Sequence, residues 1–176
     1  MSMLSFSLQQ INRWDVALCQ SCNRLSRRFT VRCLFLLVSR LGNGLFWYTL
    51  MAAMLLRYQA EALHAVLHML AAGLAGTVIY QLIKGKTLRP RPFHVYPSIV
   101  RVGKTLDKFS FPSGHTLHAV AFGIIAVFYF PGLLWLVAPF VLLVALSRPI
   151  LGLHYPSDVL AGAALGAAIA FASLYF

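Results

Sequence analysis

Long apolar stretches separated by short polar segments make up most of the chain. Residues 62–83 form a run whose only histidines or charged side chains are His64 and His68 near one end, and this run is long enough to cross a bilayer as a helix. Pro131-Gly132 predicts a tight turn between two later stretches. Five stretches have this apolar character: residues 45–57, 62–83, 116–130, 133–146 and 159–175.

The N-terminal residues show a different pattern. Residues 6–25 repeat apolar side chains on one helix face, which is typical of an amphipathic helix in the membrane interface. The stripe consists of Leu8, Ile11, Trp14, Leu18, Cys22 and Leu25. Ser39-Arg40 and Gly42-Asn43-Gly44 then interrupt the next apolar stretch, which predicts a short helix and a turn. A signal peptide has a basic segment, then an apolar core, then a cleavage site with small residues. The N-terminus lacks this succession, so we expect no removable signal peptide.

These patterns predict a single integral-membrane domain over residues 1–176. We expect an all-α, polytopic membrane helix bundle with about five or six spans, preceded by an N-terminal interfacial amphipathic helix. Residues 1–41 would form the amphipathic and short N-terminal helices, and residues 42–176 the bundle. The pattern leaves open whether residues 28–41 cross the bilayer.

Composition and charge agree with a membrane protein. Hydrophobic residues make up 60% of the chain and the mean hydropathy is +0.76, far above the usual range of soluble domains. The net charge of +11 then indicates anionic lipid, and not nucleic acid, as the partner. The three cysteines, Cys19, Cys22 and Cys33, cannot form a paired disulfide framework, so we interpret the pair Cys19 and Cys22 as packing residues.

The polar segment 84–112 holds seven of the fifteen Lys and Arg residues and a single acid, Asp107. Two predicted spans lie between His115 and Ser147, so the chain returns to the side of the membrane from which it left. The basic loop and the loop that follows Arg148 are therefore expected on one face of the bundle.

Three cations in these loops, Lys84, Arg91 and Arg148, suit a phosphoryl group. Arginine offers forked donors to two oxygens, and lysine supplies a compact charge. The alternative for each cation is an ordinary basic loop that holds lipid headgroups or follows the positive-inside bias.

Pro112-Ser113-Gly114-His115 directly precedes an apolar helix. Ser113 is placed as the N-cap, and Gly114 lets the backbone approach a ligand closely. Free amides at a helix N-terminus bind anions. The alternative is a helix start without further meaning.

Histidine transfers protons near neutral pH and can attack phosphorus, so His115 and His154 can divide the roles of general acid and nucleophile. Asp158 lies four residues after His154, and Ser157 is placed to cap the last helix. Asp158 would then hold one imidazole nitrogen and leave the other free. The alternative is that Asp158 only complements the helix dipole.

The carboxylates are too few and too scattered for a magnesium or two-metal centre. Only Asp15, Glu61, Asp107 and Asp158 are present, so we expect no metal and no cofactor. His64 and His68 lie at helical spacing without a third ligand, and we assign them a structural role. His94 and His118 remain unassigned.

Lys84 with Arg91-Pro92, then Pro112-Ser113-Gly114-His115, then Ser147-Arg148 with His154 and Asp158 together resemble the three-part motif of the type 2 phosphatidate phosphatase family, the membrane relatives of vanadium haloperoxidases. Eleven positions match with the family's internal spacings. Arg89-Pro90 is a second such pair, but its spacing to Lys84 differs, so Arg91 is assigned to the motif.

The resemblance implies a metal-independent lipid phosphatase. The residue matching His154 would attack phosphorus to form a phosphohistidine, oriented by Asp158, and His115 would protonate the leaving oxygen. The substrate phosphate would be bound by Lys84, Arg91, Ser113, Gly114 and Arg148.

Substrates of this family are membrane lipid phosphates, including undecaprenyl pyrophosphate, phosphatidylglycerol phosphate and phosphatidate. The compact chain resembles bacterial members, which implies an inner (cytoplasmic) membrane location with the site toward the periplasm. Counting positive charges alone would put the basic loop in the cytoplasm. We follow the resemblance, because Lys84 and Arg91 are expected to bind phosphate and so are not topology signals.

Two other functions fit the same residues. A lipid phosphotransferase would use the same histidine but pass the phosphoryl group to a lipid acceptor. A non-catalytic transporter or scaffold would use the basic loop only to hold anionic lipid. The sequence carries no signal for an oligomeric state.

Overall fold

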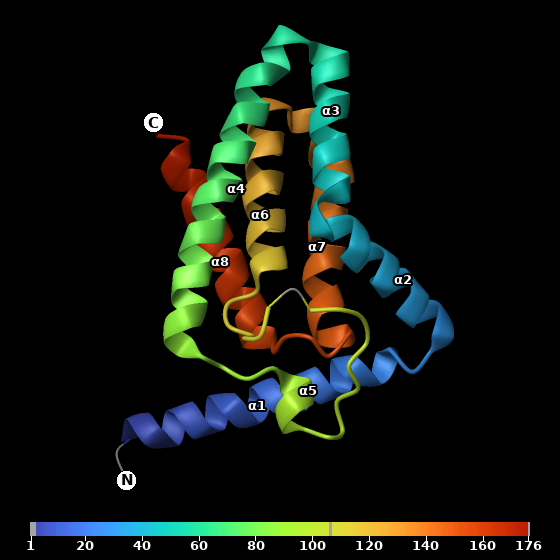
Figure 1. The fold of residues 1–176 in the computed structure, drawn as a ribbon, viewed down its shortest axis with the longest axis vertical. Coiled ribbons are helices and arrows are strands. Elements are labelled where there is room, and N and C mark those ends of the chain that lie inside the picture. The colour runs from blue at the N-terminus through green and yellow to red at the C-terminus, as the bar shows by residue number, and fades with distance from the viewer. Residues whose placement is uncertain (1–2, 106, 176) are drawn as a thin grey trace.

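The predicted apolar spans form helices that stand side by side in a bundle (Figure 1). The structure, a computed structural model, describes residues 3–105 and 107–175, and for residues 3–9 and 11 it describes only the backbone. The bundle consists of α3 (Phe46–Tyr58), α4 (Ala60–Thr87), α6 (Gly114–Tyr129), α7 (Leu134–Ile150) and α8 (Pro156–Ser173). No strand occurs among the described residues, which confirms the all-α prediction.

Four helical stretches are long and apolar enough to cross a membrane: Phe29–Tyr58, Ala60–Val95, Pro131–Ile150 and Pro156–Ser173. The apolar helix α6 is shorter but contacts α4, α7 and α8 and stands inside the bundle (Figure 1). The chain is therefore a multi-pass membrane protein, as predicted.

Helix α1 (Met3–Leu25) lies across one end of the bundle (Figure 1). Trp14 and Leu18 on the predicted apolar stripe are 65% and 52% exposed, whereas Asp15 is 4% exposed. The helix thus packs on the bundle through Asp15 and the buried Cys19, and turns Trp14 and Leu18 outward, while Cys22 of the predicted stripe packs on the bundle. The outward apolar side chains agree with an interfacial helix. The side chains of Leu8 and Ile11 lie outside the described part.

Helix α2 (Phe29–Arg40) slants away from the bundle and joins α3 through the π-helical turn η1 (Leu41–Leu45) (Figure 1). Gly44 has a φ of 121° in this turn, a conformation that glycine adopts without steric cost. The predicted short helix and turn before the first full span are both present.

Two glycines set the closest helix contact of the bundle, between α6 and α8. A Cβ atom at Gly162 would lie 2.5 Å from the backbone oxygen of Ser113, and one at Gly166 would meet the backbone oxygen of Leu117. Small residues four apart allow such backbone contact between membrane helices. The start of α6 therefore packs directly on the first turns of α8.

Replacing Gly166 by valine is expected to destabilise the protein by about 3 kcal/mol, because backbone atoms cannot move aside as a flexible side chain can. The loss is measured as a lower midpoint of thermal unfolding in detergent. Gly85→Ala is the matched control, since no atom lies within 4 Å of the added Cβ. If Gly166→Val unfolds at the same midpoint temperature as the wild-type protein, the close contact between α6 and α8 is contradicted.

Four helix ends meet at the end of the bundle that α1 covers: the C-termini of α4 and α7 and the N-termini of α6 and α8 (Figure 1). The connection from α4 to α6, which includes α5 (Pro92–Val95), runs over the same end. The two crossings between His115 and Ser147 thus return the motifs to one side, as the sequence predicted.

Two local predictions need correction. The last helix begins at Pro156 with Tyr155 as its N-cap, so Ser157 lies inside the first turn. Its backbone N–H donates to Asp15 at 2.9 Å. Helix α4 continues past residue 83 to Thr87, because the left-handed conformation that ends it occurs only at Leu88. Lys84 therefore lies on the last turn of α4.

The pair His64 and His68 lies on α4, near the end of the bundle opposite to the motifs. The imidazole of His68 is hydrogen-bonded to the Tyr129 hydroxyl at 3.1 Å and to the Ser173 hydroxyl at 2.7 Å, and the His64 ring packs on Tyr129. These contacts tie α4 to α6 and α8, in agreement with the structural role predicted for His68.

Candidate active site

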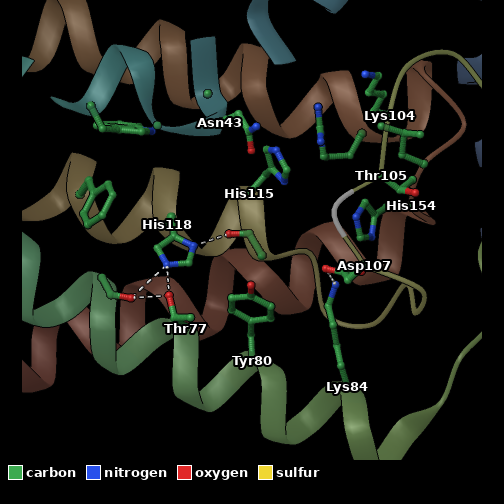
Figure 2. A pocket seen from close by; sticks show the side chains of 18 of the residues that line it. Asn43, Thr77, Tyr80, Lys84, Lys104, Thr105, Asp107, His115, His118 and His154 are labelled. Carbon is green, nitrogen blue, oxygen red and sulfur yellow. Dashed lines mark hydrogen bonds and ion pairs between the residues drawn. The ribbon is translucent and has the colours of Figure 1, made fainter. Parts of the chain in front are cut away.

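A cavity of about 390 Å³ opens at the motif end of the bundle. Helices α4, α6 and α7 and the two loops bring six of the eight predicted site residues to its wall: Lys84, Arg91, Gly114, His115, Arg148 and His154. Figure 2 shows His115 and His154 in this wall with Lys84 and Asp107 nearby. Ser113 and Asp158, both fully buried, are not part of the cavity wall.

His154 lies in the loop between α7 and α8 and is buried. Arg91 Nη1 donates a hydrogen bond to His154 Nε2 at 3.2 Å, which requires a lone pair on Nε2 and the proton on Nδ1. Nδ1 lies 3.5 Å from Asp158 Oδ2 but has no hydrogen-bond partner among the described residues. The unprotonated nitrogen of His154 therefore faces the cations.

Burial lowers the pKa of His154 well below its ordinary value of 6.5, and the positive charges of Arg91, Lys84 and Arg148 lower this pKa further. Both effects disfavour the imidazolium ion. His154 is thus held in the neutral form that a nucleophile needs.

This pKa shift predicts that His154 stays neutral at pH 6, which [¹⁵N]histidine NMR of the protein in detergent can measure with His154→Asn to assign the signal. Below about pH 6.5 only the unfolded chain would bind the additional proton, so this group lowers the stability as the pH falls. A His154 signal that titrates near pH 6.5 would contradict the effect of burial and of the three cations.

Asp158 is held by two donors that are not His154. Its Oδ2 accepts the Tyr155 backbone N–H at 2.9 Å, and its Oδ1 accepts a hydrogen bond from Arg89 Nη1 at 2.7 Å. Arg89 Nη2 forms an ion pair with Asp15 Oδ2 at 2.6 Å. A chain of charges therefore connects helix α1 to the first turn of α8, next to His154.

Sequence reasoning missed this role for Arg89 and Asp15. It set Arg89 aside because of its spacing to Lys84, yet Arg89 bridges two buried carboxylates. It counted Asp15 only as one of four scattered acids. The available signal was the repeated Arg-Pro pair in a chain with so few acids to balance its cations.

The three predicted phosphate-binding cations are buried. Lys84 Nζ and Arg91 Nη2 form ion pairs with Asp107 at 2.7 and 2.6 Å. Arg148 donates from Nε to the Ser147 hydroxyl at 2.9 Å and from Nη2 to the Ser39 hydroxyl. Asp107 is a further residue at the site that sequence reasoning counted only as a scarce acid.

Ser113 is the N-cap residue of α6 as predicted, but its hydroxyl does not cap the helix. It is instead hydrogen-bonded to the Thr116 hydroxyl at 3.0 Å, while the Ser113 backbone N–H donates to the Asp158 backbone oxygen at 3.0 Å. The following Gly114 and His115 reach the cavity. The tetrapeptide therefore joins α6 to α8 and presents His115 to the cavity.

The cavity has a polar and an apolar part. From the cations and histidines it continues between η1, α3, α4 and α6, where the wall is largely apolar and aromatic: Trp47, Tyr48, Leu70, Leu74 and Phe122. His118 lies between these parts, hydrogen-bonded to Thr77, Gly73 and Gly114 (Figure 2). Such a cavity fits a charged headgroup attached to an apolar chain.

Comparisons with known proteins find relatives of this chain. Undecaprenyl-diphosphatase BcrC of Bacillus subtilis is 37% identical over 106 residues, which cover 60% of this chain and 54% of that protein. The decaprenylphosphoryl-5-phosphoribose phosphatase of Mycobacterium tuberculosis is 40% identical over 101 residues, which cover 56% of this chain and 54% of that protein. The chain thus spans about half the length of these two relatives.

The fold is that of a solved membrane protein. The crystal structure of the first transmembrane PAP2-type phosphatidylglycerolphosphate phosphatase from Bacillus subtilis has a TM-score of 0.74 and 23% identity, covering 95% of this chain and 86% of that one. The model of the PAP2 superfamily matches residues 61–176. Because this match includes well over half of the chain and all the motifs, the protein belongs to the PAP2 superfamily.

Proposed function

We propose that the protein is a metal-independent hydrolase of membrane lipid phosphates or pyrophosphates. The observation that carries the proposal is the position of His154 Nε2. This nitrogen accepts a hydrogen bond from Arg91, which requires its lone pair to face the cations, in a cavity that continues into the apolar part of the bundle.

In the first step, His154 Nε2 forms a bond to phosphorus while the bond from phosphorus to the leaving oxygen breaks. His115, protonated when the anionic phosphate binds beside it, gives its proton to that oxygen. In the second step, His115 takes a proton from water, the water oxygen bonds to phosphorus, and the bond from phosphorus to His154 breaks. Inorganic phosphate leaves, and both histidines return to their starting forms.

The surrounding residues would stabilise the phosphoryl group and orient the nucleophile. Lys84, Arg91 and Arg148 oppose the negative charge of the transition state. Gly114, at the start of α6, lies in the cavity wall next to His115, where a helix N-terminus favours an anion. Asp158 lies near Nδ1 of His154 and stabilises the proton that this nitrogen carries once Nε2 is bonded to phosphorus.

An isoprenoid phosphate or pyrophosphate is the proposed substrate class. Two relatives carry names of enzymes that act on polyprenyl phosphates, undecaprenyl-diphosphatase and decaprenylphosphoryl-5-phosphoribose phosphatase. The apolar part of the cavity has room for the first units of a prenyl chain. Phosphatidylglycerol phosphate and phosphatidate are the glycerolipid alternatives.

We place the protein in a bacterial inner membrane with the site toward the periplasm. Lys84, Arg89 and Arg91 form ion pairs with carboxylates at the motif end of the bundle. We therefore treat them as residues of the site and not as topology signals. This supports leaving them out when positive charges are counted for the topology.

The proposal is tested with purified protein in detergent and a panel of lipid phosphates, without any lipid acceptor and with excess EDTA. We expect phosphate release from at least undecaprenyl pyrophosphate, unchanged by EDTA. Transfer to a second lipid without free phosphate would instead identify a phosphotransferase. Absence of both reactions would favour a non-catalytic lipid-binding protein.

A further inference from the structure

One carboxylate forms ion pairs with two of the cations that are assigned to the substrate phosphate. Asp107 accepts hydrogen bonds from Lys84 Nζ at 2.7 Å and from Arg91 Nη2 at 2.6 Å. All three residues line the same cavity, and Figure 2 shows Lys84 and Asp107 in direct contact. Asp107 is not one of the positions of the three-part motif.

These bonds leave the two cations few free donors. Arg91 has five N–H donors, and hydrogen bonds use four of them: Nε to the Asp107 backbone oxygen, Nη1 to the Leu153 oxygen and to His154, and Nη2 to the Asp107 carboxylate. Lys84 gives one of its three N–H groups to Asp107 and another to the Phe109 oxygen. The N–H groups that Lys84 Nζ and Arg91 Nη2 give to Asp107 become available to a phosphate only when the Asp107 carboxylate leaves.

Asp107 is ionised in this position. Burial alone would raise the pKa of this carboxyl, but the ion pairs with Lys84 and Arg91 hold the pKa below its ordinary value. A carboxylate and a phosphate are both negatively charged, and their oxygens accept hydrogen bonds from the same donors. Asp107 and the substrate phosphate therefore compete for one subsite.

The exposure of the three side chains differs. Those of Lys84 and Arg91 are 7% and 3% exposed, and that of Asp107 is 35% exposed. The carboxylate can therefore turn toward water once a phosphate replaces it on the two cations, which are themselves fixed by burial and by their remaining hydrogen bonds. In the absence of phosphate, the carboxylate also spares the cations the cost of being buried without a partner.

We propose that Asp107 is a displaceable carboxylate that occupies the phosphate subsite of the empty protein and sets its affinity for phosphate. This inference rests on the proposed function. The incoming phosphoryl group takes over Lys84 and Arg91, and Asp107 returns when inorganic phosphate leaves. Asp107 thereby lowers product inhibition, because each release of phosphate is assisted by the returning carboxylate.

The test compares Asp107→Asn with wild-type protein for inhibition by inorganic phosphate. The amide keeps the size of the side chain but removes the charge, so phosphate no longer competes with an anion. Suppose that Asp107 leaves the subsite free in about a tenth of the wild-type molecules, whereas the subsite is free in nearly all molecules of the variant. The inhibition constant of phosphate then falls roughly tenfold in the variant. Glu61→Gln is the matched control, because it removes one carboxylate from an exposed position at the far end of α4.

An inhibition constant that is unchanged or higher in Asp107→Asn, with normal phosphate release by wild-type protein, would overturn this inference alone. It would mean that Asp107 holds the cations in place for the substrate. If wild-type protein neither releases phosphate from any lipid nor is stabilised by inorganic phosphate against thermal unfolding, the proposed function falls as well.

A second measurement uses wild-type protein only. The chain contains three aspartates, Asp15, Asp107 and Asp158, so carboxyl-labelled aspartate yields three ¹³C NMR signals. Adding inorganic phosphate should shift one signal toward the value of a solvated carboxylate. Three unmoved signals at saturating phosphate would overturn the inference even if Asp107→Asn did not fold.

Discussion

Replacing His154 by alanine is expected to lower the rate of phosphate release by about 10⁴-fold or more, because loss of the nucleophile removes the covalent route and leaves only the binding groups. The initial rate of phosphate release from undecaprenyl pyrophosphate measures this loss. The variant should still fold, since His154 donates no side-chain hydrogen bond among the described residues.

His94→Ala is the matched control for this variant. His94 lies on the short helix α5, is exposed and does not line the cavity, so its removal should leave the rate within about twofold of wild type. Wild-type phosphate release by His154→Ala on every lipid of the panel would contradict the assignment of the nucleophile.

Replacing Arg89 by alanine is expected to reduce kcat by about 10²-fold and the stability by roughly 3 kcal/mol. The change leaves the buried carboxylates of Asp15 and Asp158 without their shared cation. Without Arg89, Asp158 also binds a proton more readily, so the acidic limb of the pH profile of kcat moves to higher pH. Rates across pH and thermal unfolding in detergent measure the two effects.

The shift of the pH profile separates a positioning role of Arg89 from a merely structural one. Arg89→Lys restores one positive charge but cannot bind both carboxylates with a planar fork, so it should recover part of the pH profile and less of kcat. Arg57→Ala, at an exposed position on the last turn of α3, is the control. Loss of stability without any change in the pH profile would show that Arg89 only holds α1 against α8.

The spans and the motif residues could be predicted because their signals are local. An apolar run of bilayer length forms a helix with little ambiguity, and the predicted ranges 116–130 and 159–175 agree with α6 and α8 to within a few residues. The number of crossings between His115 and Ser147 then required the motifs to meet at one end of the bundle.

The charge network could not be predicted because its partners are far apart in the chain. Asp15 and Ser157 are separated by 142 positions, and Arg89 and Asp158 by 69. No periodicity in the sequence relates a polar residue of an interfacial helix to the first turn of α8. Asp107 is closer to Lys84, but only the path of the loop over the bundle end turns its carboxylate toward the cations.

The caps show a related limit. Ser113 and Ser157 both have the residue type of an N-cap, yet each hydroxyl has a different partner in the structure. Ser157 is bound to Asp15, and Ser113 to Thr116. For Ser157 a contact with α1 outweighs the local preference, whereas the Ser113 hydroxyl is bonded to a side chain of its own helix, α6.

The central claim, a covalent bond between phosphorus and His154, is tested most directly by rapid quenching of the protein with a ³²P-labelled lipid phosphate. The prediction is a labelled protein that keeps its phosphate in alkali and loses it in acid, with the label on His154 by mass spectrometry and absent in His154→Ala. Phosphate release without any labelled protein at early times, or a label on another residue, would contradict the account.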